Sequence, residues 1–172
     1  MHATEPACGG AGARRRWRMS PAKGRPPAVL QIVPSLVSGG AERGTVEVAA
    51  ALVAAGWTSY VASAGGPLER DLARAGAVHI NLPLASKNPL VMWRNRAALL
   101  RAIRRHGIDI VHARSRAPAW SAWSAAAIAG RHFVTTFHNA YGAGSGLKLR
   151  YNSVMAKGER VIAISDFVAK HA

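Results

Sequence analysis

The sequence predicts an α/β fold, in which a doubly wound and mainly parallel sheet carries helices on both faces. Three observations favour this class. From residue 28 onwards, short apolar runs rich in β-branched residues alternate with longer amphipathic runs, as in repeated βαβ units. The apolar runs are mostly continuous, which is typical of parallel strands buried on both faces. A length of 172 residues suits one domain with a sizeable core.

Strands and helices follow one another along the chain. Strands are predicted at residues 29–33, 59–63, 78–82, 109–113, 132–137 and 160–164. Helices are predicted at residues 41–55, 67–75, 93–106, 119–129 and 147–157, and a further one begins after the sixth strand. A glycine follows each helix, at Gly56, Gly76, Gly107, Gly130 and Gly158. Glycine is common at helix ends because it adopts the left-handed conformation at little cost.

Residues 1–27 are predicted to form a disordered basic leader, and residues 28–172 one folded domain. The leader is rich in Ala, Gly, Pro and Arg and shows no periodicity. Its arginine cluster at 14–16 is not followed by an apolar segment, so a secretory signal is not expected. Because Met19 offers a second possible start, we expect the leader to be dispensable for folding.

The composition restricts the class of partner. The chain has 23 basic and 8 acidic side chains, which gives a formal charge of +15. This charge favours anionic partners such as phosphates, anionic lipids or nucleic acid, or it reflects a general bias towards arginine. The sequence contains no helix-turn-helix, RNA-recognition or zinc signature, so nucleic acid is not the expected partner. Cys8 is the single cysteine, which excludes an internal disulfide and a cysteine-based metal site and fits a reducing compartment.

The pair Gly39-Gly40 stands between the first predicted strand and the first predicted helix. Such a turn lets the backbone approach an anion, and the first helical amides point towards it. The spacing matches neither the dinucleotide-binding fingerprint nor the P-loop. A tight turn without a ligand explains the glycines equally well. Glu42, in the first helical turn, is either favoured there by the helix dipole or positioned to bind an acceptor hydroxyl.

Other polar residues follow predicted strands, where ligands bind in doubly wound sheets. Arg114 and Arg116 flank Ser115 after the fourth strand, and they either bind phosphate or face solvent. His138, after the fifth strand, either holds a sugar hydroxyl and accepts a proton or simply caps the strand. Ser165 follows the sixth strand. Two further histidines, His79 and His112, lie inside strands and are assigned structural roles.

The predicted helix at 93–106 carries five arginines and no acid, and the apolar segment at 89–93 precedes it. This composition fits a helix lying on an anionic membrane surface. It fits equally well a helix whose apolar side packs on the sheet while the arginines face water. The longest apolar stretch of the chain is too short to span a bilayer.

Five segments in order resemble the N-terminal domain of retaining GT-B glycosyltransferases of family 4. They are residues 29–43, with a Gly-Gly-Ala-Glu-Arg turn, 67–76, 109–113, 135–139, with the sequence Thr-Thr-Phe-His-Asn, and 161–165. Together they span nearly all of residues 28–172. The resemblance implies a Rossmann-like sheet that is one half of a GT-B architecture.

The resemblance also implies an activity. Such enzymes transfer a sugar from a nucleotide-sugar donor to a lipid-linked or polysaccharide acceptor in cell-envelope glycan synthesis, without a metal or another cofactor. They are cytoplasmic or lie peripherally on the inner face of the membrane. By this resemblance His138 is the catalytic residue that contacts the transferred sugar. The expected residues for binding the nucleotide sugar are Gly39, Gly40, Glu42, Arg114, Ser115, Asn139 and Ser165.

The sequence departs from this family at two points. Asn139 replaces a glycine that commonly follows the histidine. Nothing matches the C-terminal donor domain with its paired glutamates, so we expect an incomplete enzyme, either a fragment or one part of a split enzyme that needs a separate donor domain. The isolated chain is then expected to be inactive. The alternative is a basic α/β domain that binds nucleic acid or an anionic surface without catalysis. A nucleotide-dependent oxidoreductase is disfavoured, because no acidic residue ends the second strand.

Overall fold

The computed structural model describes residues 24–86, 88–139 and 146–171. Its centre is a six-stranded sheet in the order β3-β2-β1-β4-β5-β6, in which all five neighbouring pairs are parallel. The strands are β1 (Ala28–Ile32), β2 (Thr58–Ser63), β3 (Val78–Asn81), β4 (Ile110–Ala113), β5 (His132–Phe137) and β6 (Arg160–Ala163). The predicted α/β class and doubly wound sheet are therefore confirmed.

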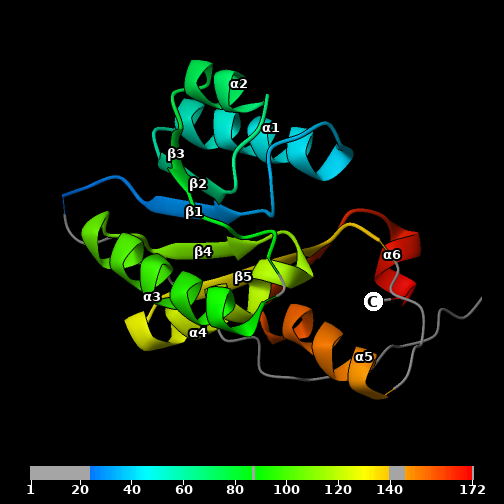
Figure 1. The fold of residues 1–172 in the computed structure, drawn as a ribbon. Helices are drawn as coiled ribbons and strands as arrows, with labels where there is room; N and C mark the ends of the chain where they lie inside the picture. Colours follow the sequence, from blue (N-terminus) through cyan, green and yellow to red (C-terminus); the bar gives the residue numbers. More distant parts are fainter. Residues whose placement is uncertain (1–23, 87, 140–145, 172) are drawn as a thin grey trace, which may run out of the picture.

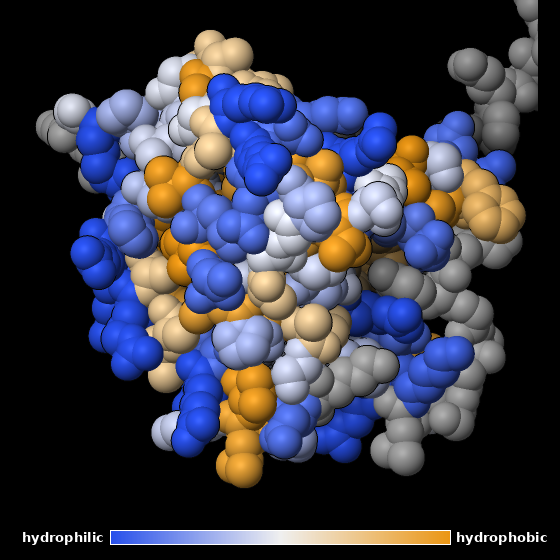
Figure 2. All heavy atoms as spheres, turned by 45° about the horizontal axis from the view of Figure 1, so that its top comes forward, coloured by the Kyte–Doolittle hydropathy of each residue, from blue (hydrophilic) through white to orange (hydrophobic). Residues whose placement is uncertain are grey.

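The helices divide between the two faces of the sheet. They are α1 (Gly40–Ala54), α2 (Glu69–Arg74), α3 (Pro89–Arg105), α4 (Arg116–Ala129), α5 (Gly146–Asn152), the 3₁₀ helix η1 (Ser153–Lys157) and α6 (Asp166–His171). Right-handed crossovers place α1 and α2 on one face and the later connections on the other. Figure 1 shows α1 and α2 grouped apart from α3 and α4. On the view in Figure 2, apolar side chains are exposed in separate patches among hydrophilic residues.

Alternate residues of the central strands supply apolar clusters on the two faces of the sheet, because successive side chains point to opposite faces. Leu30 and Ile32 of β1 belong to the larger cluster, which includes Leu99 of α3. Val33 belongs to a smaller cluster that includes Ala49 of α1. The sheet is thus buried from both sides near β1, as the continuous apolar run predicts.

The predicted bounds of α1 and α2 are right to within two residues, and the other three predicted helices differ more. The helix predicted at 93–106 begins at Pro89, because the Asn88 side chain accepts a hydrogen bond from the N–H of Leu90 at 2.9 Å and caps it. The segment at 89–93 is therefore the first turn of α3 and not a separate loop. The helix predicted at 119–129 begins at Arg116. The helix predicted at 147–157 is divided into α5 and η1.

Glycines end four of the helices in the predicted left-handed conformation. Gly56, Gly76, Gly107 and Gly130 have φ angles of 78°, 77°, 60° and 62°. Gly158 is different, since its φ is −64°. A Cβ at Gly158 would lie 2.7 Å from the carbonyl oxygen of Arg160. This glycine is therefore needed for the close approach of two backbone segments, and the predicted reason is wrong there.

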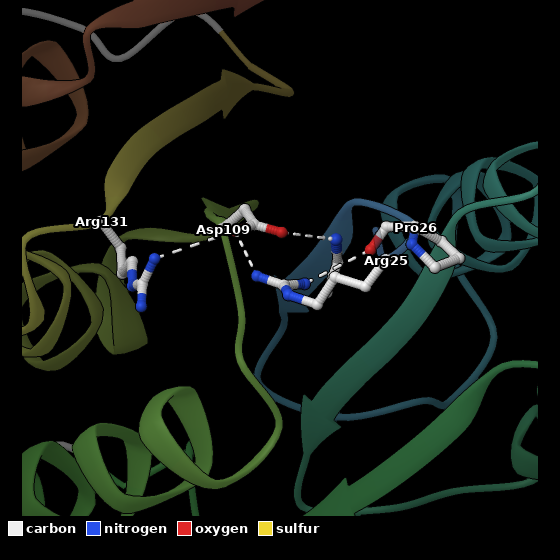
Figure 3. A network of polar contacts seen from close by, with 5 residues as sticks. Arg25, Pro26, Asp109 and Arg131 are labelled. Carbon is white, nitrogen blue, oxygen red and sulfur yellow. Dashed lines mark hydrogen bonds and ion pairs between the residues drawn. The ribbon is translucent and has the colours of Figure 1, made fainter. Parts of the chain in front are cut away.

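At the amino end of the sheet, Asp109 joins β1 to β4 (Figure 3). Its Oδ1 accepts a hydrogen bond from Nη2 of Arg25 at 2.7 Å, and its Oδ2 accepts one from the backbone N–H of Ala28 at 2.9 Å. Arg131 Nη1 lies 3.8 Å from Oδ1. Arg25 stands in the predicted leader, so the folded part begins before residue 28. Residues 1–23 of that leader lie outside the described residues.

Candidate functional site

A cleft of about 590 Å³ opens at the carboxyl ends of the central strands. The first turns of α1 form one wall, and residues that follow β4, β5 and β6 form the other. The lining residues are Gly40, Ala41, Glu42, Gly44, Arg114, His138, Asn139 and Ile164. This is the position at which ligands bind in doubly wound sheets, beyond the carboxyl ends of the strands near a change in strand order.

The N-terminus of α1 presents backbone donors to this cleft. The first helical hydrogen bond joins the N–H of Arg43 to the carbonyl of Gly39 at 3.0 Å. The N–H groups of Gly40, Ala41 and Glu42 therefore have no acceptor within the helix. Gly39 is extended, with φ 175°, so the pair is not needed for a left-handed turn. A Cβ at Gly39 would overlap the Glu42 carboxylate, and one at Gly40 would meet nothing within 4 Å.

Arg114 is the buried cation of the cleft, with only 7% of the residue exposed. The alternative of a solvated surface arginine is therefore wrong at this position. Nη1 of Arg114 donates to Oε1 of Gln31 at 3.0 Å. Nε2 of Gln31 donates in turn to the carbonyl of Thr45 in α1, also at 3.0 Å. The guanidinium is thus held between β1 and α1, and a Cβ at Gly44 would lie 3.1 Å from its Nη2 atom.

Two polar atoms beside the cleft are buried and lack a hydrogen-bond partner in the described structure: Nε of Arg114 and Nε2 of His138. Buried polar atoms are nearly always hydrogen-bonded in folded proteins. A partner for both atoms is therefore expected from a bound molecule or from solvent.

The two groups have different charge states. Burial lowers the pKa of Arg114, and Glu42 and Glu47 oppose this change. Arginine still remains charged, because its ordinary pKa lies far above neutrality. Burial also lowers the pKa of His138, the guanidinium of Arg114 lowers it further, and Glu42 opposes both. A cation and a neutral imidazole therefore share the cleft at pH 7.

The two histidines assigned structural roles make hydrogen bonds within the fold. Nε2 of His112 lies 2.7 Å from Oγ1 of Thr136 in the buried sheet. Nε2 of His79 lies 2.8 Å from Oγ of Ser63, at the far edge of the sheet. Burial lowers the pKa of His112 to about 3, with further lowering from Arg114 and His138.

Of the remaining predicted site residues, one lines the cleft and the others lie outside its lining. Asn139 lines the cleft beside His138, whereas Gly39, Ser115 and Ser165 are not among its lining residues. Ser115 is the N-cap residue of α4 without a side-chain cap bond. The Oγ of Ser165 accepts a hydrogen bond from the N–H of Val168 at 3.3 Å. Arg116 donates to Oδ1 of Asn152 at 2.9 Å, on the side of α4 and α5.

Gln31 was not predicted from the sequence, although a signal is present. It is the one polar residue in the apolar run of β1, and it is fully buried. A buried amide needs partners for both its oxygen and its nitrogen. Its position in the strand nearest the glycine turn therefore indicates a role near the cleft.

Among the described residues, no three His, Cys, Asp or Glu side chains gather as a metal site requires.

The family is decided by a match over most of the chain. Residues 38–172 match the model of Glycosyltransferase Family 4. The chain belongs to this family. The predicted resemblance is thereby confirmed. No curated protein gives a significant match to the chain.

Solved structures agree with this assignment. The crystal structure of a glycosyltransferase from Rickettsia africae is 44% identical, with a TM-score of 0.74, and the match covers 85% of this family 4 chain. Anabaena Alr3699/HepE, in complex with UDP and glucose, is 18% identical over 84% of the chain with a TM-score of 0.67. MurG from Acinetobacter baumannii is 14% identical over 80% with a TM-score of 0.58. The last two show the fold alone. The match spans only 38–41% of these three longer chains.

Proposed function

We propose that this chain forms the acceptor-side half of a glycosyltransferase cleft and that the cleft at α1 holds the diphosphate of a nucleotide-sugar donor. The observation that carries the proposal is the buried guanidinium of Arg114, which lines the same cleft as the free amides of α1. Both are donors suited to phosphate oxygens. The complex of Anabaena Alr3699/HepE with UDP and glucose supports this donor class.

These groups would act on the leaving group of the reaction. During transfer, the bond between the anomeric carbon and the diphosphate oxygen breaks, a bond to the acceptor oxygen forms, and the acceptor hydroxyl gives its proton to the departing diphosphate oxygen. Negative charge then grows on the diphosphate, and fixed positive groups in a desolvated cleft stabilise it. Arg114 meets this requirement because Gln31 already holds its guanidinium in place. The reaction as proposed uses no metal and no further cofactor.

His138 would contact the transferred sugar. Its imidazole is neutral at pH 7, and its Nε2 atom is buried and without a partner in the described structure. A neutral imidazole forms a hydrogen bond with a sugar hydroxyl without adding charge that would oppose an oxocarbenium-like centre. We assign His138 the catalytic role, and Gly40, Glu42 and Asn139 the lining of the donor site.

The binding step can be measured with pyrophosphate as a probe. We expect titration to shift the backbone amide NMR signals of Gly40, Ala41 and Glu42. Replacing Arg114 by Gln should weaken binding at least about tenfold, because hydrogen bonds to charged groups contribute roughly 1.5–3 kcal/mol. The matched control is Arg101→Gln, which removes an exposed arginine on α3. Equal binding by both variants, or shifts confined to other parts of the chain, would contradict the proposed donor site.

The proposal that this chain supplies only part of the active site has its own test. If the rest of the donor site lies on another domain or chain, then these 172 residues alone should not turn over a nucleotide sugar. Sustained transfer from UDP-glucose by the isolated chain would refute the acceptor-side assignment.

We further propose that the protein is cytoplasmic and lies peripherally on an anionic membrane surface through α3. Leu90 and Trp93 in the first turns of α3 are 73% and 61% exposed. Exposed arginines follow on the same helix, at Arg94, Arg101, Arg104 and Arg105. Exposed apolar residues with a basic helix suit an interfacial position. No described helix is long and apolar enough to cross a membrane.

Vesicle co-sedimentation measures this contact. Binding should require anionic vesicles, fall with added salt, and decrease in a Trp93→Ser variant. Ile128→Ser is the matched control, because Ile128 is a 50% exposed apolar residue on α4. Binding that is indifferent to salt and to Trp93 would rule out this surface.

A further inference from the structure

A serine, a histidine and a glutamate meet beside β2 and β3, outside the lining of the cleft. Nε2 of His79 lies 2.8 Å from Oγ of Ser63, and Nδ1 of the same imidazole lies 3.3 Å from Oε2 of Glu69. The side chain of His79 is only 14% exposed. The imidazole therefore joins the last residue of β2 to the first residue of α2.

The same three residue types form the nucleophile, the base and the orienting acid of serine hydrolases. Ser63 is fully buried, so no substrate reaches its hydroxyl. Its Oγ also accepts a hydrogen bond from the backbone N–H of Gly65 at 3.0 Å. The three side chains therefore act on the backbone beside them and not on a substrate.

The two outer side chains of this network each hold a glycine of the turn after β2. Oγ of Ser63 accepts from Gly65, and Oε1 of Glu69 accepts from the N–H of Gly66 at 2.7 Å. The two glycines have φ angles of 88° and 149°, which residues with a Cβ rarely adopt. Because His79 contacts both acceptor side chains, it holds them in the positions that this turn requires.

The glycine turn is bonded to the loop that leads into α1. The N–H of Leu36 donates to the carbonyl of Gly65 at 2.8 Å, and the N–H of Leu68 donates to the carbonyl of Leu36 at 3.1 Å. A Cβ at Gly66 would overlap the backbone of Leu36. Leu36 is fully buried and stands shortly before Gly39, the N-cap residue of α1. The turn thus supports the backbone from which α1 starts.

We propose that Ser63, His79 and Glu69 are positioning residues of the proposed donor site. They fix the glycine turn after β2, the turn fixes the loop at Leu36, and this loop places the first amides of α1 at the cleft. The inference rests on the proposed function for its effect on binding, whereas its effect on the backbone is independent of any ligand.

Amide hydrogen exchange tests the backbone effect without a ligand. His79→Ala should speed exchange at Gly66 and Leu36 at least about tenfold, because the turn loses the group that holds its acceptors. The amide NMR signal of Gly40 should shift as well. The control is His132→Ala, which removes a histidine–glutamate contact at the amino end of β5. Changes confined to the turn, with none at Leu36 and Gly40, would overturn the proposal.

The position of the imidazole proton follows from the same contacts. A carboxylate only accepts hydrogen bonds, so a neutral His79 carries its proton on Nδ1, towards Glu69, and the hydroxyl of Ser63 donates to Nε2. Glu69→Gln keeps an oxygen for the N–H of Gly66, and its amide group donates to Nδ1 when the imidazole proton moves to Nε2. Nitrogen-15 NMR at pH 8 should therefore find the proton on Nδ1 in the wild type and on Nε2 in this variant.

Pyrophosphate titration measures the effect on the donor site. Affinity should fall at least about threefold in His79→Ala and in Glu69→Ala, because the amides of α1 are no longer held in place, and it should stay within about twofold in Glu69→Gln. Equal affinity in the wild type and His79→Ala would refute the positioning role and leave the donor site in place. If the wild type binds no pyrophosphate, the donor site is refuted, and the exchange at Leu36 still decides whether the network fixes the loop.

Discussion

The buried histidine of β4 makes stability depend on pH in a defined direction. His112 is 8% exposed and bonds to Thr136 through Nε2 at 2.7 Å. Burial, followed by Arg114 and His138, lowers its pKa to about 3, whereas an unfolded histidine titrates near 6.5. As the pH falls below 6.5, the unfolded chain binds a proton that the folded chain does not. The free energy of unfolding therefore decreases with falling pH through this window.

The size of the effect follows from the two pKa values. Between pH 7 and pH 5, protonation of His112 in the unfolded state lowers the free energy of unfolding by about 2 kcal/mol, at 1.36 kcal/mol per pKa unit. This figure does not depend on the exact folded pKa, provided that it lies well below 5. A loss of about 2 kcal/mol is a large part of the stability of a small domain.

Urea unfolding at pH 7 and pH 5 measures this loss. We expect His112→Gln to lose about 2 kcal/mol less than the wild type between the two pH values, because glutamine does not titrate. The carboxylates and the other histidines are present in both proteins, so most of their contribution cancels in the difference. An equal loss of stability in the two proteins would refute the assignment of a buried, neutral His112.

Two further predictions concern contacts that stabilise the fold. Asp109→Asn removes the charge that holds Arg25 and should lower the free energy of unfolding by about 1–2 kcal/mol. The control is Asp71→Asn, which affects an exposed ion pair and should change the free energy of unfolding by less than about 1 kcal/mol. Similar losses of the two variants in urea unfolding would contradict this prediction. Gly66→Ala should lower stability by more than about 2 kcal/mol, because φ is 149° and a Cβ would overlap the backbone of Leu36. A thermal melt close to that of the wild type would show that this loop can move.

The sequence predicts strands better than helix starts in this chain. The strand at 132–137 has its predicted bounds, since Gly130 ends the preceding helix and the β-branched and aromatic run ends before His138. The predicted start of α3 is four residues late. The sequence alone does not show that the Asn88 side chain caps a helix that begins at Pro89. Local pattern thus identifies an element, whereas its first turn depends on a single hydrogen bond.

The candidate site was predictable in position and not in detail. The rule that ligands bind beyond the carboxyl ends of strands brings Gly40, Arg114 and His138 together, and the structure shows them lining one cleft. The burial of Arg114 was not predictable, because it depends on Gln31, which is 83 residues away in the sequence. The lone polar residue in the apolar run of β1 indicates a buried amide, but nothing in the local pattern identifies Arg114 as its partner.

Gly44 links the stability of α1 to the position of Arg114 in the proposed donor site. Glycine inside a helix costs about 1 kcal/mol relative to alanine, and Gly44 lies within α1. The position faces Nη2 of Arg114, where even a methyl group would approach to 3.1 Å. The helix thus gives up some of its own propensity to leave room for the cation. Gly44→Ala would therefore stabilise the helix and at the same time displace the guanidinium of Arg114. Stabilising substitutions near a functional site commonly have such a cost.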